Sequence, residues 1–309
     1  MLARLWMLAA VVAGLLLGGP ALAWNDRGHM MVAAIAYERL DPAVRDRVDV
    51  LLRLNPQYAS WVRGVARGRA AEVAFLRAAT WPDFIKGPAA GYTDDGEQPS
   101  GPQSSQNIGY ADKLQHRYWH YIDLPFSTDG TPLVQPASPN AETQIEAFRA
   151  ALASAATSDD VKSYDLVWLL HLVGDVHQPL HATSRFSAAF PRGDLGGNRV
   201  KITCSPACPK ELHAFWDDLL GRSTSPSAAI AAARKLAPSP VSPPDLSTDA
   251  WIQQSLALAE STVYAAPVGG GAGPYRLTSA YRTAARAAAR KQVQLAGARL
   301  AGVLNEALR

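Results

Sequence analysis

The sequence predicts an all-α fold built as one mainly helical domain, and two observations support this. Apolar residues recur at helical spacing in nearly every segment after residue 24, whereas only residues 199–203 have the pattern of a short strand. The composition, 48% hydrophobic and 18% charged in 309 residues, is that of a globular chain that buries a large core. We find no internal repeat and no linker between two cores. We therefore expect one domain over 24–309, with long loops and at most a short β-hairpin.

The first 23 residues have the features of a cleaved signal peptide. Arg4 precedes an apolar run over 5–19, and Pro20 and the small-residue site Ala21-Leu22-Ala23 follow it. The alternative is a membrane anchor, but roughly 15 apolar residues are short for a membrane span. We expect a mature protein that begins at Trp24, has no membrane anchor after cleavage, and is periplasmic or secreted.

Helix signals follow in order along the mature chain. Asp41-Pro42 opens an amphipathic run through Leu54, because proline is well tolerated in the first helical turn, where its missing N–H would have no partner. The same apolar spacing predicts further helices over 65–79, 142–155, 160–177, 210–220, 225–236, 248–264 and 277–307. Loops rich in Gly, Pro and Ser lie chiefly at 87–109, 125–140, 222–247 and 265–275. These long loops are candidates for substrate contact.

The charge balance excludes a strongly basic nucleic-acid-binding surface. The chain has 30 Lys and Arg against 27 Asp and Glu, and removal of Arg4 with the signal peptide leaves 29 − 27 = +2. Any attraction for nucleic acid must then come from local geometry or from bound metal cations. Two cysteines in the whole chain exclude a Cys-rich zinc or iron–sulfur module.

Histidine and aspartate residues form pairs at helical spacing. His171 and Asp175 lie one turn apart in a segment that is apolar on every face, and His213 and Asp217 repeat the arrangement. Each buried His or Asp needs a partner that offsets its loss of hydration. A hydrogen-bonded His–Asp pair in the core would supply this partner, and so would a metal ion.

Further histidines and aspartates favour the metal interpretation. Pro179 ends the helix and allows His181 to turn back toward the same site, while His120, Asp83 and His29 add two more imidazoles and a carboxylate. Imidazole and carboxylate ligands without cysteine suit zinc held for hydrolysis. Their number exceeds the needs of one ion, so we expect a cluster of two or three metals.

Together these segments resemble the zinc-dependent single-strand-specific nucleases of the mung bean nuclease type, also called nuclease/3′-nucleotidases. The motifs that carry the resemblance are Trp24 with His29, Trp81-Pro82-Asp83, His120-Tyr121-Ile122-Asp123, His171-x-x-x-Asp175, His177-Gln178-Pro179-Leu180-His181, Gly196-Gly197-Asn198 and His213-x-x-x-Asp217. The resemblance covers essentially all of 24–309. It implies the mainly helical fold that these nucleases share with zinc phospholipase C.

The resemblance also implies a cofactor of three zinc ions per chain. By the family pattern the first zinc binds Asp83, His120, His171 and Asp175, the second binds His181, His213 and Asp217, and the third binds His29 and the α-amino nitrogen and carbonyl oxygen of Trp24. Asp175 bridges the first and third ions. In the implied mechanism Asp83 and Asp175 are the catalytic carboxylates, which hold and orient a hydroxide that bridges the same two ions.

The implied activity is hydrolysis of single-stranded DNA and RNA to 5′-phosphate products, together with 3′-nucleotidase activity, by a chain that we expect to be a monomer. Zinc phospholipase C has a similar cluster. The metal ligands alone therefore leave phospholipid head groups open as an alternative substrate. A helical binding protein with incidental buried His–Asp pairs is the third hypothesis.

Residues around the cluster favour nucleic acid by the same resemblance. Tyr121 is suited to stack on a base, although a core aromatic is the alternative. Asp123 is expected to accept hydrogen bonds from the edge of the base. Asn198 is expected to hold the scissile phosphate, although a simple turn also explains the two glycines before it. Lys86 stands where family members often have arginine, and it offers a point charge in place of a bidentate fork.

Four remaining residues have structural interpretations. Cys204 and Cys208 close a five-residue loop, for which we expect a disulfide in an exported chain, while a zinc clip completed by His213 is the alternative. We expect that His116 is not a ligand. His177 is expected to pack behind the ligands, where ring N–H groups orient neighbouring side chains.

Overall fold

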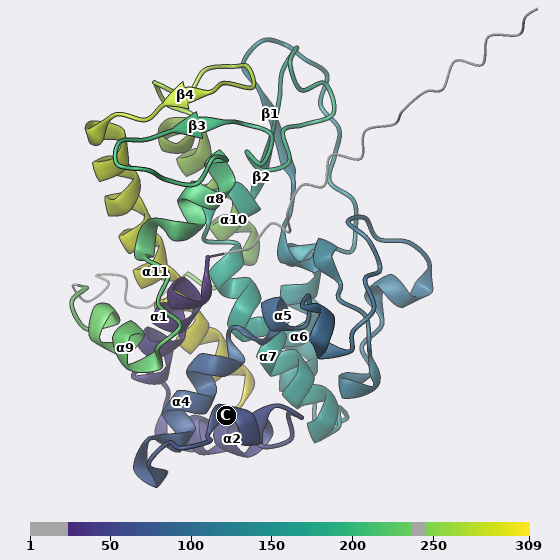
Figure 1. The fold of residues 1–309 in the computed structure, drawn as a ribbon. Helices are drawn as coiled ribbons and strands as arrows, with labels where there is room; N and C mark the ends of the chain where they lie inside the picture. The colour runs from purple at the N-terminus through teal and green to yellow at the C-terminus, as the bar shows by residue number, and fades with distance from the viewer. Residues whose placement is uncertain (1–23, 237–244) are drawn as a thin grey trace, which may run out of the picture.

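The structure, a computed structural model, describes residues 24–236 and 245–309, and it is mainly helical as the sequence predicts (Figure 1). The predicted signal peptide at 1–23 and part of the predicted loop 222–247 lie outside the described residues. The α-helices are α1 (Asp26–Tyr37), α2 (Pro42–Leu52), α3 (Tyr58–Trp61), α4 (Ala70–Ala78), α5 (Trp81–Phe84), α6 (Ala141–Ala153), α7 (Asp159–Asp175), α8 (Leu212–Asp217), α9 (Pro226–Ala233), α10 (Thr248–Leu258) and α11 (Ser279–Ala307).

Every helix that the sequence predicts is found, with ends that shift by a few residues, whereas α1 and the one-turn helices α3 and α5 were not predicted. Nine of the twelve residues of α1 are buried, and its N-cap Asn25 makes no side-chain capping hydrogen bond. A helix that is apolar on most faces and has no cap gives a weak periodic signal. This helix carries His29, a ligand candidate for which the sequence predicted no helix.

The strands form two short parallel pairs, so neither pair is a hairpin. β1 (Leu124–Ser127) pairs with β2 (Thr183–Phe186), and β3 (Ile202–Thr203) pairs with β4 (Tyr275–Arg276). β3 is the C-terminal part of the strand predicted at 199–203, whereas β1 overlaps the start of the predicted loop 125–140. Parallel partners far apart in the chain leave little local signal for a sequence pattern to detect.

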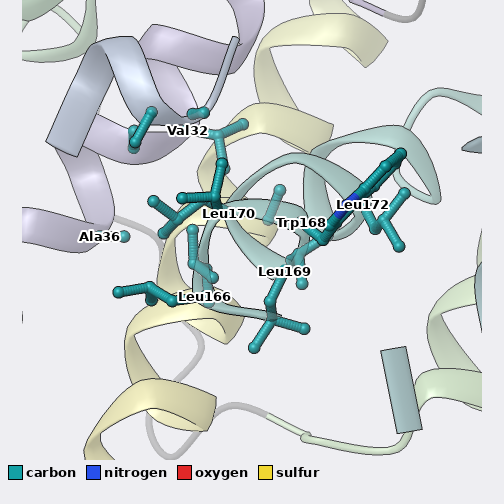
Figure 2. Close-up of a cluster of buried hydrophobic side chains, with 14 of the residues drawn as sticks. Val32, Ala36, Leu166, Trp168, Leu169, Leu170 and Leu172 are labelled. Atoms are coloured by element: carbon teal, nitrogen blue, oxygen red, sulfur yellow. The ribbon is translucent and has the colours of Figure 1, made fainter. Parts of the chain in front are cut away.

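Helix α7 runs through the centre of the larger core. Its residues 162–175 are all buried, and Leu166, Trp168, Leu169, Leu170 and Leu172 are fully so. Figure 2 shows several of these side chains beside Val32 and Ala36 of α1. Full burial of a leucine contributes about 1.5–3 kcal/mol, so this helix is a rigid support for the side chains at its C-terminal end.

A second, smaller core lies around α8 and the start of α11. It gathers Val200, Ile202, Leu212 and Trp216 with further apolar residues, and Leu219 packs against both cores. A disulfide joins Cys204 and Cys208, with an S–S distance of 2.08 Å, which confirms the predicted bond and excludes the zinc clip. Of the helices in the described ranges, none is long and apolar enough to span a membrane.

Candidate metal centre

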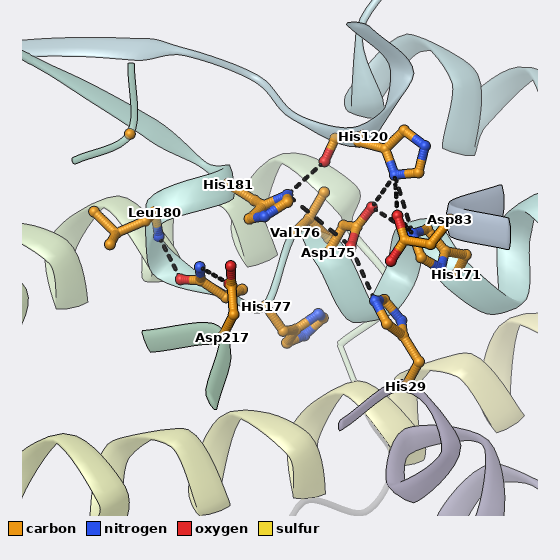
Figure 3. Close-up of polar contacts among 12 residues, drawn as sticks. His29, Asp83, His120, His171, Asp175, Val176, His177, Leu180, His181 and Asp217 are labelled. Atoms are coloured by element: carbon orange, nitrogen blue, oxygen red, sulfur yellow. Dashed lines mark hydrogen bonds and ion pairs between the residues drawn. The ribbon is translucent and has the colours of Figure 1, made fainter. Parts of the chain in front are cut away.

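The last turns of α7 carry His171 and Asp175 on one face (Figure 3). His171 Nδ1 donates to the carbonyl oxygen of Ala79 at 2.7 Å. This bond directs Nε2 toward Asp175 Oδ2 at 3.2 Å and toward Oδ1 of Asp83, from α5, at 3.7 Å. A backbone acceptor on one ring nitrogen is the usual way in which a metal-ligating histidine is oriented.

Asp175 is the centre of the first group of ligand candidates. His120, at the end of a 3₁₀ helix over Arg117–His120, places Nδ1 3.1 Å from Asp175 Oδ2. His29 of α1 places Nε2 3.4 Å from the other oxygen, Oδ1. The His29 ring stacks on His171 at 3.8 Å, and a Cβ on Gly174 would lie 2.8 Å from His29 Nδ1. The two oxygens of Asp175 thus face different imidazoles, as a bridging carboxylate requires.

The second group contains His181, His213 and Asp217. The Nε2 atoms of the two histidines lie 3.0 Å apart, and His213 Nε2 lies 3.6 Å from Asp217 Oδ2. Each ring again donates its other nitrogen to the backbone, His181 to His120 O at 2.9 Å and His213 to Gly196 O at 2.7 Å. His181 Nδ1 is also 4.0 Å from Asp175 Oδ1, so both groups belong to one centre.

The donor set fits several cations. Ligand atoms in each of three groups lie within 4.8 Å of one another, namely His29, Asp83 and His171, then His120, His171 and Asp175, then His181, His213 and Asp217. Both ring nitrogens of His29 and Asp175 Oδ1 are buried without a hydrogen-bond partner. Orphaned buried polar atoms are costly, and a bound cation satisfies them. This pattern does not match simple hydrogen-bonded His–Asp pairs.

Burial controls the protonation of these side chains. It lowers the pKa of His29 to about 3 and that of His171 to about 4, so both imidazoles are neutral and able to bind metal. Burial raises the pKa of Asp175 and of Asp217 well above the ordinary value, so a cation is needed to hold them ionised. For Asp83 burial also acts to raise the pKa, but Lys86 and His171 outweigh it and keep the pKa below its ordinary value.

Trp24 begins the described chain and is fully buried in the larger core. It lies directly before α1, and a Cβ on Gly28 would be 2.6 Å from Trp24 Cβ. The indole of Trp24 therefore packs in the larger core. The predicted ligand role of its α-amino group stays a prediction.

A pocket of about 320 Å³ contains two of the predicted substrate-binding residues, Tyr121 and Asp123. Tyr121 is partly buried and donates its hydroxyl to Glu97 O at 2.5 Å. It therefore packs on the core and also lines the pocket. Burial, together with the negative charge of Asp194, raises the pKa of Asp123 to about 7. The backbone N–H of Ile122 donates to His181 O at 2.8 Å, which ties this segment to the metal centre.

The other two predicted substrate-binding residues do not line the pocket. Lys86 Nζ lies 2.8 Å from Asp83 Oδ1, and its side chain is only 6% exposed, so its charge is used on a ligand candidate. Asn198 is partly buried, and its side-chain amide donates to Leu195 O at 2.8 Å. Its amide is thus engaged within its own turn.

Two histidines lie outside the centre, as the sequence analysis expects. His116 Nε2 is 2.8 Å from Asp112 Oδ2, and the His116 ring stacks on Trp119 at 3.6 Å. His177 Nδ1 donates to Val173 O at 2.7 Å and faces away from the ligand candidates.

Three residues around the site were not predicted from the sequence to have a role there. Gln178 donates to Asp217 Oδ1 at 2.8 Å, Asp194 accepts hydrogen bonds within the Gly-rich loop, and Arg192 lines the pocket. Gln178 and Asp194 stand inside or beside motifs already singled out. Proximity to those motifs is the signal that could have identified them.

A mainly helical domain whose buried histidine and aspartate side chains form three groups able to bind a metal is typical of metalloproteins. The chain belongs to the S1/P1 nuclease family, whose model matches residues 24–309. Members of this family are generally zinc-dependent. The match confirms both the resemblance seen in the sequence and the predicted fold class.

Two plant proteins are among the similar curated sequences. The chain is 28% identical to Endonuclease 3 of Arabidopsis thaliana over 223 residues, which are 70% of this chain and 60% of that protein. It is 26% identical to Endonuclease 5 of the same plant over 226 residues, which cover 62% of that protein. The chain thus spans about three fifths of the length of these relatives.

Proposed function

We propose that this chain is an exported zinc-dependent nuclease that hydrolyses single-stranded DNA and RNA to 5′-phosphate products and removes phosphate from 3′-nucleotides. The observation that carries the proposal is the centre around Asp175, where imidazoles and carboxylates from α1, α5, α7 and α8 converge. The relatives named endonucleases belong to the same family and support nucleic acid as the substrate.

Three zinc ions per chain suit the donor set. Asp83, His120, His171 and Asp175 would hold the first, His181, His213 and Asp217 the second, and Trp24, His29 and Asp175 the third. When bound, zinc supplies Lewis-acid stabilisation of phosphoryl charge and activation of water at neutral pH. Three dications would also provide the positive field that the mature chain, with a formal charge of 29 − 27 = +2, lacks elsewhere.

The protein's own side chains select and orient the substrate. Tyr121 offers a ring face for stacking, and Asp123 offers a carboxyl group to the edge of a base in the same pocket. An aromatic pocket can take a base only when that base is unpaired, which accounts for a single-strand preference. Lys86 keeps Asp83 ionised, and Asn198 lies on the loop that approaches the second zinc group.

Export follows from the proposed signal peptide. Its removal after Ala23 would free the α-amino group of Trp24 in a periplasmic or external compartment. An α-amino group has a pKa of about 7.7–8, so a zinc ion can displace its proton near neutral pH, whereas a peptide nitrogen has no lone pair to offer. The nuclease would then become complete only after export, acting as a monomer.

A panel of substrates tests the proposal. Purified mature chain, reloaded with zinc, is assayed on single-stranded DNA, RNA, 3′-AMP, duplex DNA and short-chain phosphatidylcholine, with a chelator-treated sample as control. We expect cleavage of the first three and its loss on chelation. Hydrolysis of phosphatidylcholine without cleavage of any nucleic acid would instead establish the phospholipase alternative. A chain that retains no zinc would contradict both.

A further inference from the structure

The loop over residues 194–198 connects the pocket to the second group of ligand candidates. Leu195 lines the pocket, and the Gly196 carbonyl oxygen accepts a hydrogen bond from His213. Leu195, Gly196 and Gly197 all have left-handed backbone conformations, with φ of 55°, 56° and 78°. A Cβ on Gly196 would lie 2.2 Å from Leu180 O, so only glycine fits there. Leu195 has a side chain that makes the left-handed conformation energetically unfavourable, so other contacts must hold the loop in place.

The carboxylate of Asp194 supplies those contacts. It is fully buried, and Oδ1 accepts the backbone N–H of Gly197 at 3.0 Å and that of Arg185 at 3.1 Å. The Tyr264 hydroxyl donates to Oδ2 at 2.9 Å, and Arg185 Nε lies 3.5 Å from the same atom. The Asp194 carbonyl oxygen accepts the Arg199 N–H at 3.1 Å. The loop is thus fastened at both ends through one residue.

The loop in turn orients a ligand candidate. His213 Nδ1 donates to Gly196 O at 2.7 Å, which directs the ring so that Nε2 faces His181 Nε2 at 3.0 Å. The Gly196 carbonyl can receive this bond only while the left-handed turn persists. The path from Asp194 to His213 therefore consists of two hydrogen bonds and one peptide unit.

We propose that Asp194 is a positioning residue for the metal site formed by His181, His213 and Asp217, acting through the Gly196 carbonyl that orients the His213 ring. The inference rests on the proposed zinc site of that group. Asp194 is fully buried and belongs to none of the three groups of ligand candidates. Partners that orient a ligand in this way commonly contribute 10–100-fold to metal affinity.

The test compares Asp194→Asn with Asp165→Asn. An amide has one acceptor oxygen with two lone pairs, so the variant loses an acceptor for at least one of the three donors now bound by the carboxylate, and it also loses the negative charge beside Arg185. Asp165 is a matched control, because it is also a fully buried aspartate, accepts a hydrogen bond from Asn107 at 3.0 Å, and lies on α7 remote from the loop. Zinc per chain is measured by elemental analysis after dialysis against graded chelator concentrations, with circular dichroism and thermal melting of the zinc-loaded chains.

We expect Asp194→Asn to release one zinc equivalent at roughly tenfold lower chelator strength than wild type, with the other two equivalents retained and the control unchanged. Tyr264→Phe removes a single donor to Asp194 and should shift the same equivalent by a smaller factor. This milder variant provides the test if Asp194→Asn fails to fold.

Wild-type zinc retention in the folded Asp194→Asn chain would overturn the inference. So would unchanged retention in Tyr264→Phe when Asp194→Asn does not fold. These failures differ from failure of the proposed function, which would appear in the wild-type chain itself as missing zinc or as no cleavage of nucleic acid.

Discussion

Asp123 should make the fold less stable at alkaline pH, and Asp123→Asn should remove that cost. Burial and the charge of Asp194 raise the pKa of Asp123 from 3.8 to about 7. Between these two values the unfolded chain has lost the proton while the native chain keeps it. The native state therefore loses stability as the pH rises from about 4 to about 7, and the full cost remains above that.

The magnitude follows from the pH interval. Between pH 5 and pH 7 the native carboxyl stays protonated and the unfolded one is ionised, which at about 1.36 kcal/mol per pH unit amounts to about 2.7 kcal/mol. At about 2–4 °C per kcal/mol for a domain of this size, and with a discount for the remaining solvent contact of Asp123, we expect roughly 5 °C. The variant should thus gain roughly 5 °C in Tm over wild type at pH 8.5 beyond any gain at pH 5.

Thermal melting of the metal-free wild type and variant at both pH values measures this difference, because bound cations would themselves lower the pKa of a neighbouring carboxyl group. The ligand candidates are common to both chains, so their own titration cancels in the comparison. Asp46→Asn, which replaces an exposed carboxyl group on α2, is the control and should show the same small difference at both pH values. An Asp123→Asn effect that is equal at pH 5 and pH 8.5 would refute the reasoning.

Three further predictions concern the proposed centre and pocket. Asp175→Asn should reduce turnover by well over the 10–100-fold that is typical for residues hydrogen-bonded to a metal ligand, because both oxygens of Asp175 face ligand candidates. Asp165→Asn is the control, and wild-type turnover with full zinc content would reject the bridging role of Asp175. Tyr121→Ala should raise KM for single-stranded DNA while zinc content stays full. Tyr58→Ala, which changes a partly buried tyrosine outside the pocket, is the control and should leave KM unchanged. A loss of zinc or a lower Tm in Tyr121→Ala would instead assign Tyr121 to the core. One extra residue before Trp24 should lower zinc content and cleavage, and equal values in both forms would remove the amine from the site.

The sequence predicted those parts of the fold whose signal is local. The run around His171 is apolar on every face, so its burial in α7 could be inferred, and the spacing of His171 and Asp175 placed them on one face. The strands β1 and β2 could not be inferred, because each depends on a partner far away in the chain. The same limit applies to Asp194, whose importance depends on Tyr264 and Arg185 meeting it in the folded chain.

At position 174 the stability of helix α7 and the packing of the candidate metal centre favour different residues. Glycine inside a helix costs about 1 kcal/mol relative to alanine, so position 174 near the end of α7 is where an engineer seeking thermostability would first intervene. The His29 ring, which stacks on His171, occupies the space that the methyl group of an alanine at position 174 would need. A substitution that strengthens the isolated helix would therefore push α1 away from α7. In this protein local stability has been given up so that two distant segments can meet.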